Sequence, residues 1–100
     1  MDPLALTSRW MAAARAREGE RPHRLFLDPL AAELAGPEGF AWLEHTEPVA
    51  RLGGQAGTPV GPGLYVVVRT RFFDDFLLRA CRDGGVRQVV LLASGMDARA

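Results

Sequence analysis

The sequence has few of the residues that form disulfide-held or metal-held folds. Among 100 residues there is one cysteine, Cys81, which excludes an internal disulfide. Two histidines, His23 and His45, together with a single cysteine are too few to predict a structural zinc site. Cys81 lies in an apolar stretch, which indicates a small packing residue and not a reactive thiol. The histidines lie in polar, turn-like segments and are expected to be exposed. We therefore expect no metal.

Net charge and long apolar runs are also missing. Twelve basic and twelve acidic side chains cancel, so no overall field favours nucleic acid or an anionic membrane surface. No segment approaches the roughly 20 apolar residues of a membrane span. The N-terminus lacks the basic and apolar regions of a secretion signal. A hydrophobic content of 48% indicates a globular domain instead, and we expect a cytoplasmic protein without nucleic-acid or membrane partners.

Helices are predicted over most of residues 1–47. An alanine- and arginine-rich segment over 5–18 has the spacing of a helix with one apolar side. A second helical segment follows Asp28, which suits an N-cap, and ends at Gly36, which suits a C-cap. A third segment covers 37–45. The apolar side of the first helix contains Trp10, Met11 and Ala14.

Residues 48–63 predict an irregular loop, because five glycines and three prolines lie between Thr46 and Gly63. A helix is predicted over 65–83, where apolar residues follow a three-and-four spacing and two glycines come directly after. A strand over 64–68 is the alternative for the beginning of this helix. The face of the helix that we expect to be buried consists of Val68, Phe72, Phe73, Phe76, Leu77, Ala80 and Cys81.

Residues 86–92 predict a strand that is buried on both faces. The four residues from Val89 to Leu92 are all large and apolar, without the alternation of a half-exposed strand. Such a run is typical of a central parallel strand that helices cover on both sides. The predicted fold class is α/β, with N-terminal helices followed by the first strand of a parallel sheet. Since that strand needs neighbours, we expect residues 1–100 to be the N-terminal part of one larger domain. The unpaired strand edge is expected to favour self-association.

The turn after this strand has small residues, which let a ligand approach the backbone closely. Ala93, Gly95 and Ala98 form the pattern Ala-x-Gly-x-x-Ala, a weakened form of the dinucleotide fingerprint. From the pattern alone, a plain structural turn and a nicotinamide-binding loop are both open.

Four segments, in this order and spacing, resemble the start of the leucine carboxyl methyltransferase-like family. They read TSRWMAAARARE, RLFLDPLAAELAG, VVVRTRFFDDFLL and RQVVLLASGMDARA. The resemblance covers nearly the whole chain apart from the Gly/Pro loop over 48–63. It implies a class I, Rossmann-like methyltransferase fold truncated after its first strand, a helical lid over 1–47, a helix over 65–83, and a strand and cofactor loop over 86–100. It also implies S-adenosyl-L-methionine as cofactor and O-methyl transfer to a small-molecule or carboxyl acceptor.

The resemblance further implies which residues hold the cofactor, although it identifies no catalytic residue. The arginine that opens RTRFFDD, Arg69, would bind the methionine carboxylate, for which a planar guanidinium is suited. The alternative for Arg69 is a surface ion pair with Asp75. The other implied cofactor-binding residues are Ala93, Ser94 and Gly95 in the loop, Asp97 just behind it, and Arg9 on the first helix.

Two other functions are alternatives to the methyltransferase. One is a non-catalytic remnant or interaction module, and the other is part of a nicotinamide-dependent oxidoreductase. For the methyltransferase, we expect residues 1–100 alone to be inactive, because the ribose and adenine contacts would come from later strands.

Overall fold

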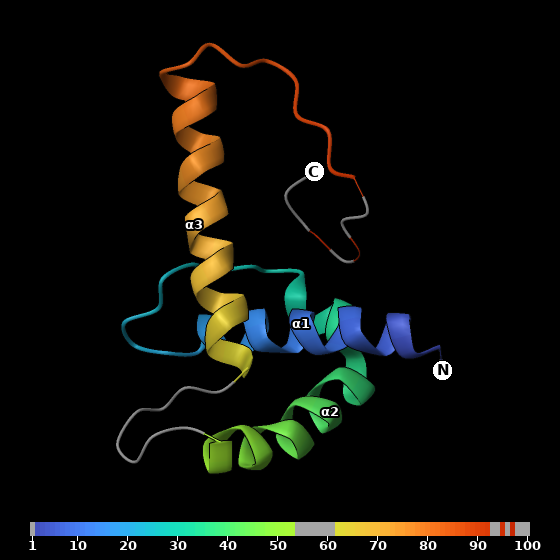
Figure 1. The fold of residues 1–100 in the computed structure, drawn as a ribbon. Coiled ribbons are helices and arrows are strands. Elements are labelled where there is room, and N and C mark those ends of the chain that lie inside the picture. Colours follow the sequence, from blue (N-terminus) through green and yellow to red (C-terminus); the bar gives the residue numbers. More distant parts are fainter. Residues whose placement is uncertain (1, 54–61, 93–94, 96, 98–100) are drawn as a thin grey trace.

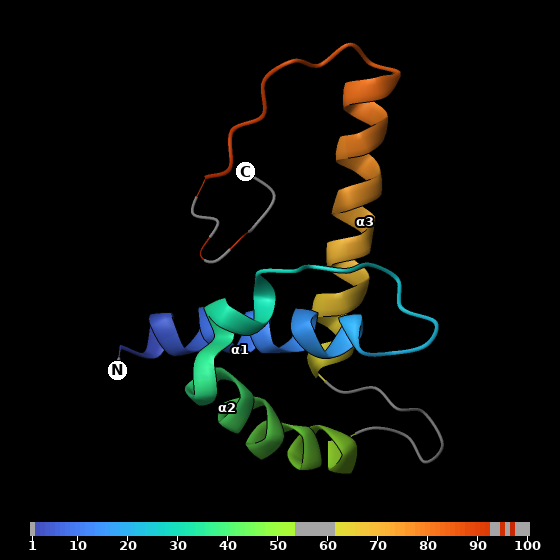
Figure 2. The ribbon, with the colours of Figure 1, turned by 180° about the vertical axis from the view of Figure 1, so that it is seen from behind.

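A computed structural model describes residues 2–53, 62–92, 95 and 97, and within these residues it contains three helices. The helices are α1 (Pro3–Gly19), α2 (Ala31–Gly53) and α3 (Pro62–Arg82). Helices α1 and α2 pack together at the base, and α3 begins against α1 and rises away from it (Figures 1 and 2). The segment after α3 runs back toward α1, against which Gly95 lies.

Helix α1 has a capped N-terminus and an alanine-rich, buried middle. The Asp2 side chain accepts a hydrogen bond from the backbone N–H of Leu4 at 3.1 Å, and Pro3 occupies the first turn, where no N–H is needed. The alanine-rich middle has high helix propensity. Ala12, Ala13 and Ala14 are buried, so this part of α1 forms the centre of the molecule.

Helix α2 is two helical segments joined at Gly36. This glycine has φ 62° and ψ 177°, a conformation that residues with a Cβ rarely adopt, so it ends the first segment as its sequence position predicts. Asp28 caps the start by accepting a hydrogen bond from Leu30 N–H at 3.1 Å. The second segment continues to Gly53, past the point where the Gly/Pro loop is predicted to begin. Ala50, Arg51 and Leu52 are good helix formers, which accounts for the extension beyond Pro48.

The core is small and consists mainly of alanine. Its buried members are Ala12, Ala13, Ala14, Ala35, Leu43 and Val66, with Trp10, Met11, Leu34 and Phe40 packed around them. Small side chains let the backbones of α1 and α2 come close together. At Gly39 an added Cβ would lie 2.5 Å from the backbone oxygen of Arg9. The packing of α1 against α2 therefore depends on close backbone approach and less on large side chains.

The strand predicted over 86–92 is not formed, and residues 85–91 have no regular secondary structure. Val90 is 78% exposed and Leu92 is 85% exposed. A parallel strand needs hydrogen-bonding neighbours and covering helices, and the described part of the chain contains no other strand to pair with it. Within residues 2–53, 62–92, 95 and 97 the structure is helical, so the α/β prediction is met only in its helices.

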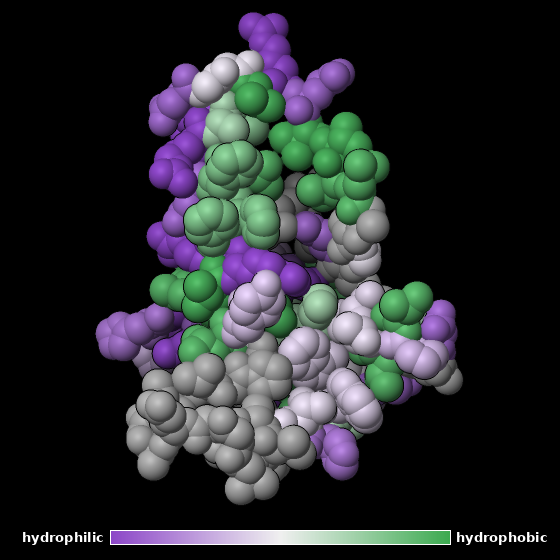
Figure 3. Space-filling model, viewed as in Figure 1, coloured by the Kyte–Doolittle hydropathy of each residue, from purple (hydrophilic) through white to green (hydrophobic). Residues whose placement is uncertain are grey.

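The face of α3 that was predicted to be buried is also largely exposed. Val68, Phe72, Phe73 and Phe76 are exposed, as is Cys81. The three-and-four spacing predicts the helix correctly, and α3 excludes a strand over 64–68. The spacing does not show whether another element covers this face: α1 lies against the beginning of α3, and the rest of α3 rises away from it (Figures 1 and 2). Figure 3 shows the resulting apolar side chains along α3 and on the segment after it.

Candidate functional site

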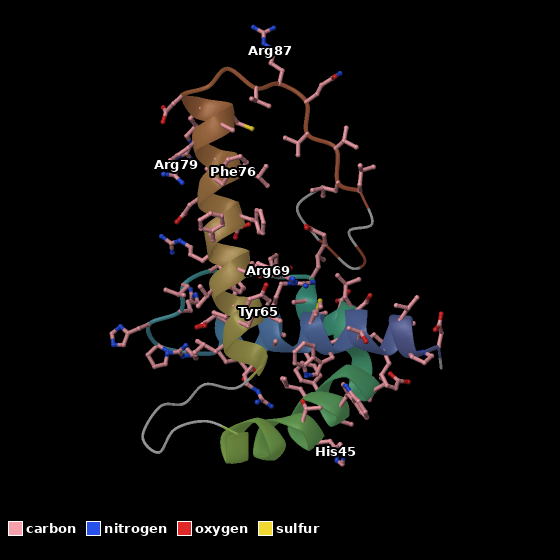
Figure 4. All side chains as sticks on the ribbon, in the orientation of Figure 1. His45, Tyr65, Arg69, Phe76, Arg79 and Arg87 are labelled. Carbon is pink, nitrogen blue, oxygen red and sulfur yellow. The ribbon has the colours of Figure 1, made fainter. Side chains whose placement is uncertain are left out.

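The Arg69 side chain lies between α3 and α1 (Figure 4). Its guanidinium carbon is 5.5 Å from the ring centroid of Tyr65, one turn earlier on α3. Its Nη2 also donates a hydrogen bond to the sulfur of Met11 on α1, at 3.6 Å. The side chain is half-buried. An aromatic ring and a thioether therefore contact a charged group that has five N–H donors.

Within the described residues, no carboxylate forms an ion pair with Arg69. Asp75, the alternative partner, instead binds Arg71, whose Nε lies 3.0 and 3.1 Å from its two carboxylate oxygens. Arg71 also donates a hydrogen bond to the carbonyl oxygen of Leu25. A thioether is a weak acceptor, so the Arg69 donors remain suited to an external anion.

Gly95 lies against the same helix as Arg69. It has φ 60°, and a Cβ added to it would lie 3.0 Å from the hydroxyl oxygen of Ser8. Ser8 and Met11 are three residues apart on α1 and so lie on one face of that helix. Gly95 thus contacts one residue of this face and Arg69 contacts the next. Arg69 and Gly95, which the family resemblance assigns to one ligand, are 26 positions apart in the sequence. Both contact the same face of α1.

Arg9 lies elsewhere, on the side of α1 that faces α2. Its Nη1 is 3.4 and 3.5 Å from the carbonyl oxygens of Leu34 and Ala35, at the end of the first segment of α2. The last carbonyls of a helix have no partners within it, and a cation there is favourable. Adjacent helical residues point about 100° apart, which separates Arg9 from Ser8. The structure does not bring Arg9 to Arg69.

The remaining predicted site residues are only partly described. Asp97 is half-buried, whereas Ala93 and Ser94 lie outside the described residues. Three residues that the sequence did not single out for the site, Ser8, Met11 and Tyr65, contact its members. The spacing of Tyr65 and Arg69, one turn apart, is visible in the sequence. The contact between Met11 and Arg69 joins positions 58 apart, and no local pattern indicates it.

Other charged residues on α1 hold the chain that leads into α2. Arg15 Nε lies 3.1 Å from a carboxylate oxygen of Asp28, and both side chains are mostly buried. The buried Glu18 carboxylate accepts hydrogen bonds from Arg21 at 2.9 and 3.1 Å. These pairs fix the segment between the two helices.

The described part of the chain contains neither a metal-binding cluster nor a membrane-spanning helix. It contains no cluster of three or more His, Cys, Asp and Glu side chains that would hold a metal ion. None of its helices is both long and apolar enough to span a membrane.

Residues 8–100 match the leucine carboxyl methyltransferase family. Relatives from Parafrankia sp. (strain EAN1pec), Saccharopolyspora erythraea and Mycolicibacterium smegmatis are 48%, 42% and 40% identical to this chain. Their names describe them as S-adenosyl-L-methionine-dependent methyltransferases. The alignments cover 96%, 97% and 94% of this chain, and 29%, 32% and 32% of the relatives. The chain therefore spans about a third of the length of these relatives. No solved structure matches it.

Proposed function

This chain belongs to the leucine carboxyl methyltransferase family, and from that premise we propose that it forms part of an S-adenosyl-L-methionine-dependent methyltransferase. We propose O-methyl transfer to a small-molecule or carboxyl acceptor as the reaction. The observation that carries the proposal is the position of Arg69. Its guanidinium has no carboxylate partner within the described residues, and it reaches the face of α1 that Gly95 also contacts.

The residues at this position suit the amino-acid end of the cofactor. Arg69 would bind the carboxylate through charge-assisted hydrogen bonds, which two parallel N–H groups of a guanidinium can form. The Ser8 hydroxyl donates to the carbonyl oxygen of Leu4 at 3.2 Å, so its own oxygen is an acceptor suited to the ammonium group. Gly95 has no side chain, which lets the ligand approach the backbone. When bound, the cofactor supplies a methyl group on a sulfonium, and the residues named here bind and orient it.

The names of the relatives favour this reaction class over a nicotinamide-dependent oxidoreductase. We assign no residue of this chain to acceptor binding or to proton removal.

The proposal is tested by following the Gly95 amide by NMR during titration with S-adenosyl-L-methionine. We expect weak, saturable binding, since the chain spans about a third of the relatives' length. Methionine, which has the carboxylate, should shift the same signal, and adenosine, which lacks it, should not. Arg69→Ala should weaken binding by about 1.5–3 kcal/mol, the usual contribution of a hydrogen bond to a charged group. Arg69→Lys keeps the charge but not the planar donor pair, and should give an intermediate loss. Equal affinities for wild type and Arg69→Ala would remove Arg69 from the site.

A further inference from the structure

We propose that Tyr65 is a positioning residue, whose ring holds the Arg69 guanidinium in the orientation that meets the cofactor carboxylate. This inference rests on the proposed function. The observations that carry it are two contacts of the Arg69 guanidinium, one with the ring of Tyr65, which lies beside it on α3 (Figure 4), and one with the sulfur of Met11 on α1.

The distances are those of a direct cation–π contact. The guanidinium carbon lies 5.5 Å from the Tyr65 ring centroid, inside the range of about 6 Å in which such contacts are attractive. The two residues are four apart on α3, so the helix itself brings them together. Met11, from α1, accepts a hydrogen bond from Nη2 of Arg69, so that a residue of a second helix also holds the guanidinium.

Packing of the core does not account for the Tyr65 ring. Tyr65 is 68% exposed, whereas the next two residues, Val66 and Val67, are buried and pack α3 against its neighbours. Neither the ring nor the thioether competes for the Arg69 donors as a carboxylate would. Tyr65 and Met11 therefore fix the direction of the guanidinium while leaving its hydrogen-bonding capacity for a ligand.

Fixing this side chain before binding lowers the entropy that binding removes. A free arginine side chain samples many rotamers, and ordering it weakens any complex that needs one of them. Loss of an exposed cation–π contact corresponds to about a two- to fivefold loss of affinity. The contribution depends on the ring and not on the phenol hydroxyl, so phenylalanine should replace tyrosine.

The test compares Tyr65→Leu, Tyr65→Phe and a matched control, Phe76→Leu. Phe76 is an exposed aromatic residue on α3 about two turns beyond Arg69, so its loss removes a ring without touching the guanidinium. The first measurement is the Nε–Hε signal of Arg69 by ¹⁵N NMR without ligand. In wild type, Tyr65→Phe and Phe76→Leu we expect a signal displaced by the ring current. In Tyr65→Leu we expect it to move to the position of the solvent-averaged arginines.

The second measurement is the affinity for methionine, read from the Gly95 amide. We expect Tyr65→Leu to weaken it about two- to fivefold, with Tyr65→Phe and Phe76→Leu unchanged. An unchanged Arg69 signal in Tyr65→Leu would overturn the inference, as would an equal loss in Tyr65→Phe. The proposed function fails separately, when wild type does not bind or Arg69→Ala binds equally well. In that event the ligand-free signal still decides whether Tyr65 holds Arg69.

Discussion

Replacing Gly39 by alanine tests the close approach of α1 and α2 that places the Ser8–Met11 face. In an exposed helix this substitution stabilises by about 1 kcal/mol, because alanine is the better helix former. At Gly39 the new Cβ would lie 2.5 Å from the carbonyl oxygen of Arg9 and 2.9 Å from its carbonyl carbon, whereas ordinary contacts begin at 3.4 Å. Both atoms belong to the backbone, so the helices themselves have to move apart.

The cost of moving the helices apart decides whether Gly39→Ala raises or lowers the free energy of unfolding. Overpacking of this kind costs about 1–3 kcal/mol, and it also loosens the contacts of the buried alanines on both helices. Because both crowded atoms belong to the backbone, we expect a cost in the upper part of this range, about 2–3 kcal/mol. After the gain of about 1 kcal/mol in helix propensity is subtracted, Gly39→Ala should lower the free energy of unfolding by about 1–2 kcal/mol.

The assay is urea unfolding followed by far-UV circular dichroism, with Gly63→Ala as the matched control. A Cβ at Gly63 would lie 3.8 Å from Leu43 Cδ1 and 3.9 Å from Ala14 Cβ, which are ordinary contacts. This control should therefore stabilise the chain, by up to about 1 kcal/mol. The two glycine-to-alanine changes should have opposite signs. A Gly39→Ala variant as stable as wild type would refute the close packing of α2 against the backbone of α1.

Two further predictions concern stability and association. Arg15→Ala should lower the free energy of unfolding by about 3 kcal/mol, because it leaves the mostly buried Asp28 carboxylate without its charged partner. In urea unfolding, the double variant with Asp28→Ala should lose less than the sum of the two single losses. We also expect the chain to self-associate through the exposed apolar segment 86–92. Val90→Lys should therefore reduce the sedimentation coefficient at high protein concentration, whereas the control Arg87→Lys should not. If the sedimentation coefficients of both variants depend on concentration in the same way, segment 86–92 is not the surface of association.

The parts of the fold that sequence predicts well are those set by local chemistry. Asp28 and Gly36 mark the start and end of a helical segment because a capping oxygen and a left-handed glycine act on their immediate neighbours. The spacing along α3 likewise depends only on the helix repeat. The extension of α2 beyond Pro48 was missed, because a proline weighs against helix while the good helix formers after it continue one.

Features that depend on distant residues were not predictable in the same way. The run from Val89 to Leu92 has the composition of a buried strand, but a strand forms only beside another strand. Arg69 was assigned through family resemblance, whereas its contact with Met11 requires α1 and α3 to be packed first. The Arg9 guanidinium contacts α2, and a step of one residue along α1 separates its direction from that of Ser8.

The central claim is that Arg69 and Gly95 belong to one binding site on α1. Its most direct test is the set of intermolecular nuclear Overhauser effects from the α-proton of bound methionine. One site predicts contacts to the Arg69 side chain and to the Gly95 α-protons in the same complex, both lost in Arg69→Ala. Contacts to Gly95 alone, or to neither residue, would contradict it.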